Sequence, residues 1–435
     1  MSTLPPPALP GRRLPRGVRH FLHTESSGGI VLLAGAVVAL VWANSPWSAS
    51  YDGLWGTEVA IELGRFTLAE DLRHWINDGL MALFFFVIGL EIKGEVVHGD
   101  LRSPRAAALP AVAALGGMVV PAVVYLAINA GSAGANGWGI PMATDIAFAL
   151  GVVALLGSRV PASLKLFLLT LAIVDDIGAI LVIALFYSSN LNLVALAVAV
   201  ALLLVIVVLR RAQVVWVPCY VVLGIGVWLA TLLSGVHATI AGVALGLMTP
   251  ARPLAPAAVA REWADDLADE PSPEELAAMT RLAKASVSVA ERLEHQLHSV
   301  TSFVIVPLFA LANAGVVISA AVFDAPDATA VAAGVVLGLV VGKVVGISAF
   351  SWLAVRLGVG TLPSGVRWGQ LIGIAALAGV GFTVSLFIAG LAFDEVELQA
   401  PAKVGILTAS AIAAAVGSAV LVRLARAPDP AEPPA

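Results

Sequence analysis

The feature that most limits how this chain can fold is a series of long apolar runs. Each run has roughly 20 residues, about the length that a helix needs to cross the hydrocarbon core of a bilayer. In lipid a helix also satisfies its own backbone hydrogen bonds. The sequence therefore predicts an all-α polytopic membrane protein with twelve transmembrane helices, at residues 28–44, 73–92, 106–129, 140–157, 162–187, 192–209, 214–233, 236–249, 299–320, 328–355, 367–392 and 403–422.

Composition agrees with a membrane location and excludes several other classes. Of the 435 residues, 59% are hydrophobic and 12% are charged, against about 25% charged in soluble domains. One cysteine, Cys219, excludes a disulfide scaffold, and no His/Cys cluster indicates structural zinc. A net charge of −5 without an aromatic-interleaved basic patch argues against nucleic acid. The expected partner is the lipid bilayer.

The ends of the chain and its basic residues predict an orientation. Residues 1–19 form a proline- and arginine-rich tail without the apolar core of a signal peptide, and residues 427–435 form a second polar tail. We expect both to be disordered around a membrane domain at 20–426. With both termini cytoplasmic, all but four of the 24 Lys and Arg residues lie inside, as the positive-inside rule requires. The exceptions are Arg65, Arg73 and Lys403 outside, and Lys343 within a helix.

Two connecting segments are long. The outer one, 45–71, contains TEVAIEL, Gly64 and RFTL, an alternating pattern that favours a small β-hairpin over an irregular loop. The inner one, 250–298, carries the acidic stretch EWADDLADEPSPEE. We expect a solvated insert with a short helix there.

Four charged residues lie deep within predicted helices: Asp145, Asp175, Asp176 and Lys343. Each costs at least about 2.5 kcal/mol in the membrane if it is unpaired. A structural ion pair would use one Asp and the Lys, whereas three carboxylates against one ammonium leave negative charge for a cation or protons. Adjacent helical residues point about 100° apart. One of Asp175 and Asp176 can therefore meet Lys343 while the other faces a water-filled cavity.

The expected ligand of this aspartate pair is a proton or a small hard cation. Carboxylate, carbonyl and water oxygens suit Na⁺ or Li⁺, and no Cys, His or Met stands beside the pair. Two close carboxylates are also expected to titrate as a coupled pair.

Two of the predicted helices look interrupted. Pro141 precedes Asp145 midway along the fourth, and Gly379 and Gly381 lie midway along the eleventh. Glycine-rich segments can also be ordinary packing interfaces. However, these two are the middle members of triplets 3–5 and 10–12, which run in opposite directions as in an inverted repeat. We expect them to cross at the midplane, with Asp145 and Lys343 offsetting the partial charges of the half-helix ends.

Seven segments occur in an order that resembles the NhaA family of Na⁺/H⁺ antiporters. They are GLEIKGE, ATDIAFALG, LAIVDDIGAI, SGVHATIAGVALG, RLEHQLH with PLFALANAGV, VGKVVGIS and GFTVSLFIAG. The resemblance covers roughly residues 20–425. Inverted repeats are known from this family, so the repeat assignment is not independent of the resemblance.

The resemblance implies roles for individual residues. Asp175 and Asp176 would bind the cation and the exchanged protons, and Lys343 would pair with Asp175. Asp145 and Lys343 would balance the crossed half-helices. The remaining implied residues are Thr144 and Thr383 lining the site, Asp78 in the ion pathway, and Glu91, Glu95, His237, Glu294 and His298 in pH sensing. We expect this last group, with His295, near cytoplasmic helix ends.

The resemblance also implies the activity. The protein would be a secondary transporter and not an enzyme. It would exchange cytoplasmic Na⁺ or Li⁺ for external H⁺ by alternating access, electrogenically and without a cofactor, for Na⁺ and pH homeostasis. We expect it in a bacterial inner membrane as a homodimer joined through the outer hairpin. The sequence departs from the family at Gly94, where a basic residue is expected, and in the 250–298 loop.

Three other classes use similar residues. An intramembrane aspartyl protease needs its two aspartates on separate facing helices and a GxGD signature, which is absent here. A gated cation channel would need a continuous pore, and a substrate symporter would need a roomier polar cavity.

Overall fold

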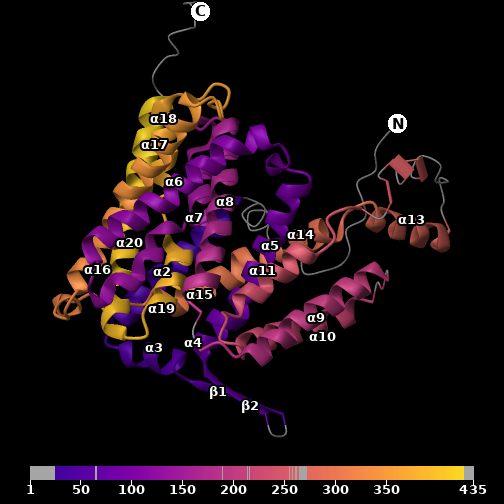
Figure 1. Ribbon diagram of the computed structural model, residues 1–435, viewed down its shortest axis with the longest axis horizontal. Coiled ribbons are helices and arrows are strands. Elements are labelled where there is room, and N and C mark those ends of the chain that lie inside the picture. The colour runs from indigo at the N-terminus through magenta and orange to yellow at the C-terminus, as the bar shows by residue number, and fades with distance from the viewer. Residues whose placement is uncertain are drawn as a thin grey trace, which may run out of the picture.

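The computed structural model describes residues 25–425, except 64–65, 189, 213, 215, 254, 257, 260–261 and 264–271. Both predicted tails and much of the acidic stretch lie outside these residues. Figure 1 shows a helical body from which a β-hairpin projects at one end.

Helices make up most of the described chain. The α-helices are α2 (Glu25–Ala43), α3 (Ser48–Trp55), α4 (Leu72–His74), α5 (Met81–Val97), α6 (Pro104–Asn129), α7 (Ile146–Leu156), α8 (Ala162–Phe186), α9 (Leu193–Arg211), α10 (Val217–Leu232), α11 (Thr239–Met248), α13 (Pro273–Ala285), α14 (Val289–Val300), α15 (Val306–Asn313), α16 (Ala328–Leu337), α17 (Lys343–Arg356), α18 (Trp368–Leu377), α19 (Phe382–Ala392) and α20 (Val396–Ala425).

Shorter or tighter helical segments connect several of these. Three have π-helical hydrogen bonding: η1 (Trp75–Leu80), η5 (Thr301–Ile305) and η7 (Gly338–Gly342). Four are 3₁₀-helices: η2 (Asp100–Arg102), η3 (Ala133–Met142), η4 (Gly157–Arg159) and η6 (Ala320–Phe323).

The lengths of the helices identify a multi-pass membrane protein. Within the described residues, 6 helices are long and apolar enough to cross a bilayer, or up to 9 if each of three sharply bent pairs is one crossing. α10 and α11 are apolar but shorter. Each of the twelve predicted ranges contains a helix, but twelve crossings and the inverted repeats remain predictions.

Two of the bent pairs are the helices predicted to be interrupted. η3 and α7 meet at 42° across residues 143–145, and α18 and α19 meet at 48° across residues 378–381. Pro141 lies near the end of η3, and the second break contains Gly379 and Gly381. The interruption of both helices is therefore confirmed.

The third bend was not predicted. The outer segment 45–71 begins with α3, which turns 118° away from α2. α3 is held by Tyr51 and Trp55, which are buried four residues apart on one face. The Tyr51 hydroxyl lies 2.9 Å from the Leu311 carbonyl oxygen and accepts from the Gly315 backbone N–H. Residue 315 must be glycine because a Cβ there would meet the Tyr51 ring.

The predicted outer hairpin is confirmed. Strands β1 (Glu58–Leu63) and β2 (Phe66–Asp71) pair antiparallel, with Glu58 opposite Asp71. Trp75 anchors the hairpin by donating to the Val59 carbonyl at 2.9 Å. Burial alone would raise the pKa of Asp71, but hydrogen bonds from the backbone and ring of His74 hold that pKa below its usual value. Asp71 thereby caps α4, which follows β2 directly.

The inner segment 250–298 contains helix α13, which begins with a capping box between Ser272 and Glu275. The predicted ninth helix, 299–320, has the wrong bounds. A continuous helical path of 25 residues runs from Val289 to Asn313. Its first part, VAERLEHQLH, is amphipathic, so its charged face hides it from a search for apolar runs.

Candidate functional site

The two broken helices meet at their breaks. The backbone N–H of Asp145 donates to the Val380 carbonyl at 2.7 Å. The Ser385 hydroxyl on α19 donates to the Ile140 carbonyl of η3 at 2.7 Å. A break frees buried backbone groups that need new partners. Here each broken helix supplies hydrogen-bond partners to the other, and these bonds stabilise the crossing.

Asp145 caps the N-termini of both half-helices at the crossing. One carboxylate oxygen accepts from the backbone N–H of Phe148 in α7 at 2.9 Å. The other accepts from the backbone N–H and the hydroxyl of Thr383 in α19, at 2.9 and 2.6 Å. A helix N-terminus carries partial positive charge, so one buried carboxylate lies where two such charges converge.

Lys343 lies on the other side of the crossing and is fully buried. Its ammonium group donates to Asp175 Oδ2 and to the Met142 carbonyl, both at 2.5 Å, and to the Thr144 hydroxyl at 3.0 Å. An ammonium group has three donors, and all three are used. Met142 ends η3, so the positive charge sits at a negative helix C-terminus.

Close packing of α17 against α6 brings Lys343 into the crossing. Gly346 on α17 faces Gly116 on α6, and a Cβ at either position would meet the backbone carbonyl of the other. The absence of side chains lets the two helices approach closely. Lys343 begins α17 directly after the π-helical η7, one turn before Gly346.

Asp175 and Asp176 are neighbours on α8 but have different surroundings. Asp175 Oδ2 forms the ion pair with Lys343 and lies 2.6 Å from the Thr144 hydroxyl. Asp175 Oδ1 is buried and has no hydrogen-bond partner in the part of the chain that the structure describes. Asp176 is 3% exposed. Within the described residues its carboxylate has no hydrogen-bond or ion-pair partner. A buried carboxylate without a partner is costly in its charged form, and a bound proton or cation would remove that cost.

Acidic side chains continue from this pair along α5 and α14. The charged groups that act most strongly on the Asp176 carboxylate are Asp175 and Glu91. Glu91 in turn faces the charges of Glu95 and Glu294. A Cβ at Gly94 would lie 3.9 Å from a carboxylate oxygen of Glu294, so the basic residue expected there would have met this acid.

One member of this series was missed in the sequence. Glu291 is a charged neighbour of Glu294 and precedes it by three residues on α14, a spacing that puts both on one helix face. The sequence signal was present in the ERLEH segment. His295 also acts on Glu294, whereas His298 does not, and both histidines are exposed.

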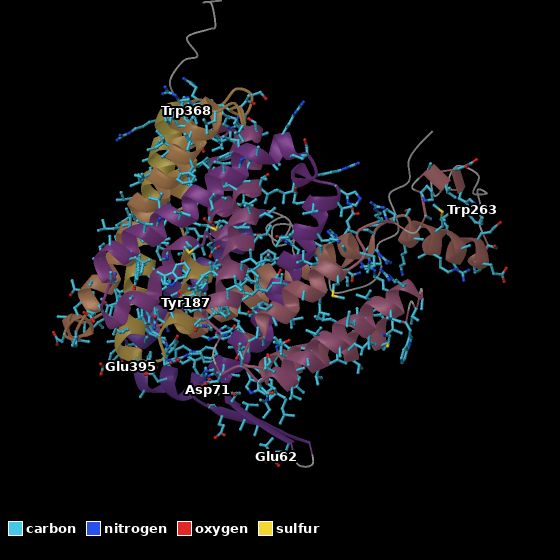
Figure 2. All side chains as sticks on the ribbon, in the orientation of Figure 1. Glu62, Asp71, Tyr187, Trp263, Trp368 and Glu395 are labelled. Atoms are coloured by element: carbon cyan, nitrogen blue, oxygen red, sulfur yellow. The ribbon has the colours of Figure 1, made fainter. Side chains whose placement is uncertain are left out.

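The expectation that His237 lies with these residues is wrong. Its ring nitrogen is 2.7 Å from the Tyr187 carbonyl, just beyond the C-terminal end of α8. Figure 2 shows Tyr187 nearer to Asp71 and Glu395, at the hairpin end, than to Trp368 at the opposite end. His237 precedes an inward-running helix in the predicted topology, so the same topology puts it on the outer side.

Asp78 also lies toward the hairpin end and away from the contacts of the aspartate pair. It is part of η1, and its backbone carbonyl accepts from Trp228 Nε1 at 2.8 Å. Its neighbours around a small hollow include Leu68 of β2 and Trp75. The preceding residue, Asn77, exchanges side-chain hydrogen bonds with Asn313 of α15.

Comparison with known proteins places the chain among transporters. Residues 19–421 match the family model described as Na⁺/H⁺ antiporter 1. The chain is 49% identical to "Na(+)/H(+) antiporter NhaA" of Rhodopirellula baltica, over 97% of each protein. It is 47% identical to "Na(+)/H(+) antiporter NhaA 3" of Frankia alni, over 96% of this chain and 92% of the relative. For the NhaA of Pseudomonas putida the identity is 48%, over 94% of this chain and 97% of the relative.

These matches span nearly the whole chain and agree with the buried charges at the two broken helices. The protein belongs to the NhaA family of Na⁺/H⁺ antiporters.

Proposed function

We propose that this protein exchanges cytoplasmic Na⁺ or Li⁺ for external H⁺ at Asp175 and Asp176. The observation that carries the proposal is Asp176, a buried carboxylate beside the Asp175–Lys343 pair that has no hydrogen-bond or ion-pair partner among the described residues. The names of the relatives support Na⁺ and H⁺ as the transported ions. The site offers oxygen atoms as ligands, and oxygen is the type of ligand that both Na⁺ and Li⁺ prefer.

Competition for the two carboxylates would couple the ions. Asp176 and the free Oδ1 of Asp175 offer oxygens to an entering cation. A proton on either acid removes the charge that the cation needs, and a bound cation disfavours the proton. The ammonium of Lys343 competes for Asp175, so it would help to release the cation.

Alternating access would follow from the same energetics. With the site empty, Asp176 would keep an uncompensated charge through the reorientation, which is costly in a membrane. The loaded forms avoid that cost. The joined breaks of the two helices, bent by 42° and 48°, support movement around one fixed crossing. Membership of the family implies more protons than Na⁺ per cycle, and two carboxylates are compatible with that ratio. Exchange would then be electrogenic and would serve Na⁺ and pH homeostasis.

The function is tested by transport in proteoliposomes. A pH gradient is imposed and Na⁺, Li⁺ or K⁺ is added, while an internal dye reports pH. We expect Na⁺ and Li⁺ to dissipate the gradient and K⁺ to leave it, with a rate that depends on membrane potential. Unitary currents would instead indicate a channel, and dependence on an organic solute would indicate a symporter.

We further propose that the acidic series on α5 and α14 sets the pH dependence from the cytoplasmic side. The series begins at Glu91, whose charge acts on Asp176, and continues through Glu95, Glu294 and Glu291. Coupled carboxylates can titrate well above the usual range of an isolated carboxylate. His237 is left out because it lies at the other end of the protein.

Changing one titratable side chain on α14, either in the series or beside it, is expected to move the pH profile. In Glu294→Gln or His298→Ala, the midpoint of the pH profile should shift. The midpoint is measured at saturating Na⁺, where competition between Na⁺ and protons at the aspartate pair is suppressed. Glu397→Gln changes an exposed acid at the start of α20 and serves as the control. If both α14 variants keep the parental midpoint, Asp175 and Asp176 alone set the pH dependence.

We also propose a homodimer joined through the hairpin, in a bacterial inner membrane with both termini cytoplasmic. A lone two-stranded sheet is marginally stable, and pairing of free edges across a two-fold axis would enlarge it. Val59 and Ile61, on one face of β1, are 41% and 44% exposed.

Deleting residues 56–67 should therefore give monomers that still exchange ions, measured by size-exclusion chromatography with light scattering and by transport. A Val59→Thr/Ile61→Thr variant keeps the strands and should weaken the dimer less. A deletion variant that dimerises as strongly as the parent would place the interface elsewhere.

A further inference from the structure

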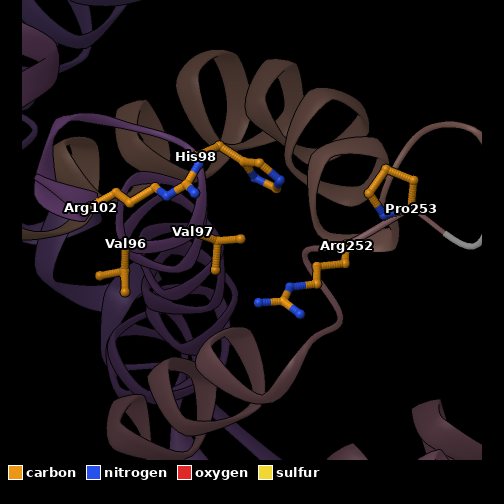
Figure 3. A pocket seen from close by; sticks show the side chains of 6 residues that line it. All are labelled: Val96, Val97, His98, Arg102, Arg252 and Pro253. Atoms are coloured by element: carbon orange, nitrogen blue, oxygen red, sulfur yellow. The ribbon is translucent and has the colours of Figure 1, made fainter. Parts of the chain in front are cut away.

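A hollow of about 510 Å³ lies between the end of α5 and the chain that follows α11 (Figure 3). The residues that line it are Val96, Val97, His98, Arg102, Arg252 and Pro253. It lies at the α5 end that carries Glu95, on the predicted cytoplasmic side. Neither the aspartate pair nor the acidic series uses these six residues.

The charge around this basic hollow is one-sided. Arg102 ends η2 and Arg252 follows α11, so two separate parts of the fold bring their arginines to one space. Within the described residues, neither arginine side chain has an ion-pair or hydrogen-bond partner, and no carboxylate lines the hollow. Figure 3 shows the His98 ring and the Arg252 guanidinium pointing into the space. The guanidinium groups of Arg102 and Arg252 repel each other, and an anion between them would remove the repulsion.

Stabilisation of the helix end does not account for the whole arrangement. Basic residues near the C-terminus of α5 suit its partial negative charge, which explains His98 and, in part, Arg102. Arg252 belongs to a different segment and is exposed. Its position over the same space therefore indicates a shared ligand.

The apolar part of the lining favours a lipid over a free anion. Val96, on the last turn of α5, is 49% exposed beside the arginines. A phospholipid offers both a phosphate for guanidinium groups and glycerol and acyl carbons for valine and proline. In cytoplasmic leaflets, basic side chains attract anionic lipids by about 1 kcal/mol each.

We propose that the basic hollow binds the phosphate of an anionic phospholipid of the cytoplasmic leaflet. Arg102 and Arg252 hold the phosphate from opposite sides, and Val96 contacts the adjoining carbons. This lipid site goes beyond ion exchange. The only part of the proposed function on which it depends is the orientation of the protein in the membrane.

The test measures lipid retention by native mass spectrometry after titration with phosphatidylglycerol or phosphatidylcholine. The parent should retain phosphatidylglycerol in preference to phosphatidylcholine. The double variant Arg102→Gln/Arg252→Gln should weaken phosphatidylglycerol binding about 30-fold, which follows from two arginines at the quoted energy. Arg423→Gln, which removes an exposed arginine near the end of α20, is the matched control and should bind like the parent.

Two further measurements distinguish a lipid phosphate from free phosphate and a lost binding site from a misfolded variant. Inorganic phosphate and glycerol phosphate should not raise the melting temperature of the parent, whereas short-chain phosphatidylglycerol should, and should do so less in the double variant. Arg102→Lys/Arg252→Lys keeps the charge and should recover part of the binding. Unchanged lipid retention in the glutamine variant, or equal stabilisation by inorganic phosphate, would overturn the lipid site. Transport need not change in any arm, so the outcome is independent of the exchange assay.

Discussion

Asp176→Asn is expected to abolish Na⁺-dependent proton movement, down to the rate of protein-free liposomes. The amide can neither release a proton nor offer a full negative charge to Na⁺, and within the described residues no side chain that could take over either role is hydrogen-bonded or ion-paired to Asp176. Asp175→Asn should abolish or severely impair exchange, because it also removes the negative charge that pairs with the Lys343 ammonium. Transport is measured with an imposed pH gradient across a range of Na⁺ concentrations.

The matched control is Asp324→Asn, the same chemical change at an exposed residue after η6. It should leave exchange at the parental rate. Equal expression and an unchanged elution profile of the Asp176 variant would show that it folds. Near-normal Na⁺ affinity and rate in that variant would mean that the cation binds elsewhere.

Lys343→Ala is expected to give the largest loss of stability. Removing one partner of a buried ion pair typically costs about 3–5 kcal/mol, because the other charge stays behind without compensation. Here Asp175, Thr144 and the Met142 carbonyl lose their shared donor. The variant should melt at a lower temperature than the parent. Its activity should also need a higher pH, because losing a nearby positive charge favours the protonated acids.

A double variant separates lost charge pairing from lost packing. Lys343→Met keeps most of the side-chain volume and should still destabilise. Adding Asp175→Asn removes the orphaned charge and should restore part of the melting temperature. If Lys343→Ala matches the parent in both melting temperature and pH profile, the pairing does not matter for either property.

Much of the fold could be predicted because each feature depends on local sequence. The alternation in TEVAIEL and RFTL indicated strands, and these residues form β1 and β2. Proline and glycine in mid-helix indicated the two breaks. Charges such as Asp175 and Lys343 were conspicuous because they lie in apolar runs. Charge counting and helix geometry predicted that one of Asp175 and Asp176 meets Lys343. The family resemblance implied that this one is Asp175, and the contact is present.

The remaining features depend on long-range packing or on amphipathic surfaces. α3 forms because Tyr51 reaches carbonyls about 260 positions along the chain, which no local pattern reveals. The amphipathic start of α14 concealed both the true beginning of that helix and the place of Glu291 in the acidic series. His237 was misplaced because it was grouped with the other titratable residues. Its own helix end, followed through the predicted topology, would have put it on the outer side.

The most direct test of the central claim is to measure protons released when Na⁺ binds to the purified protein. Na⁺ is titrated into the detergent-solubilised protein in weakly buffered solution near the pH of half-maximal activity, and the pH change is recorded. If Na⁺ and protons compete for Asp175 and Asp176, the parent should release protons saturably with Na⁺ and Li⁺ but not with K⁺, and Asp176→Asn should release none. Na⁺ binding without proton release, or full release from Asp176→Asn, would contradict exchange at this site.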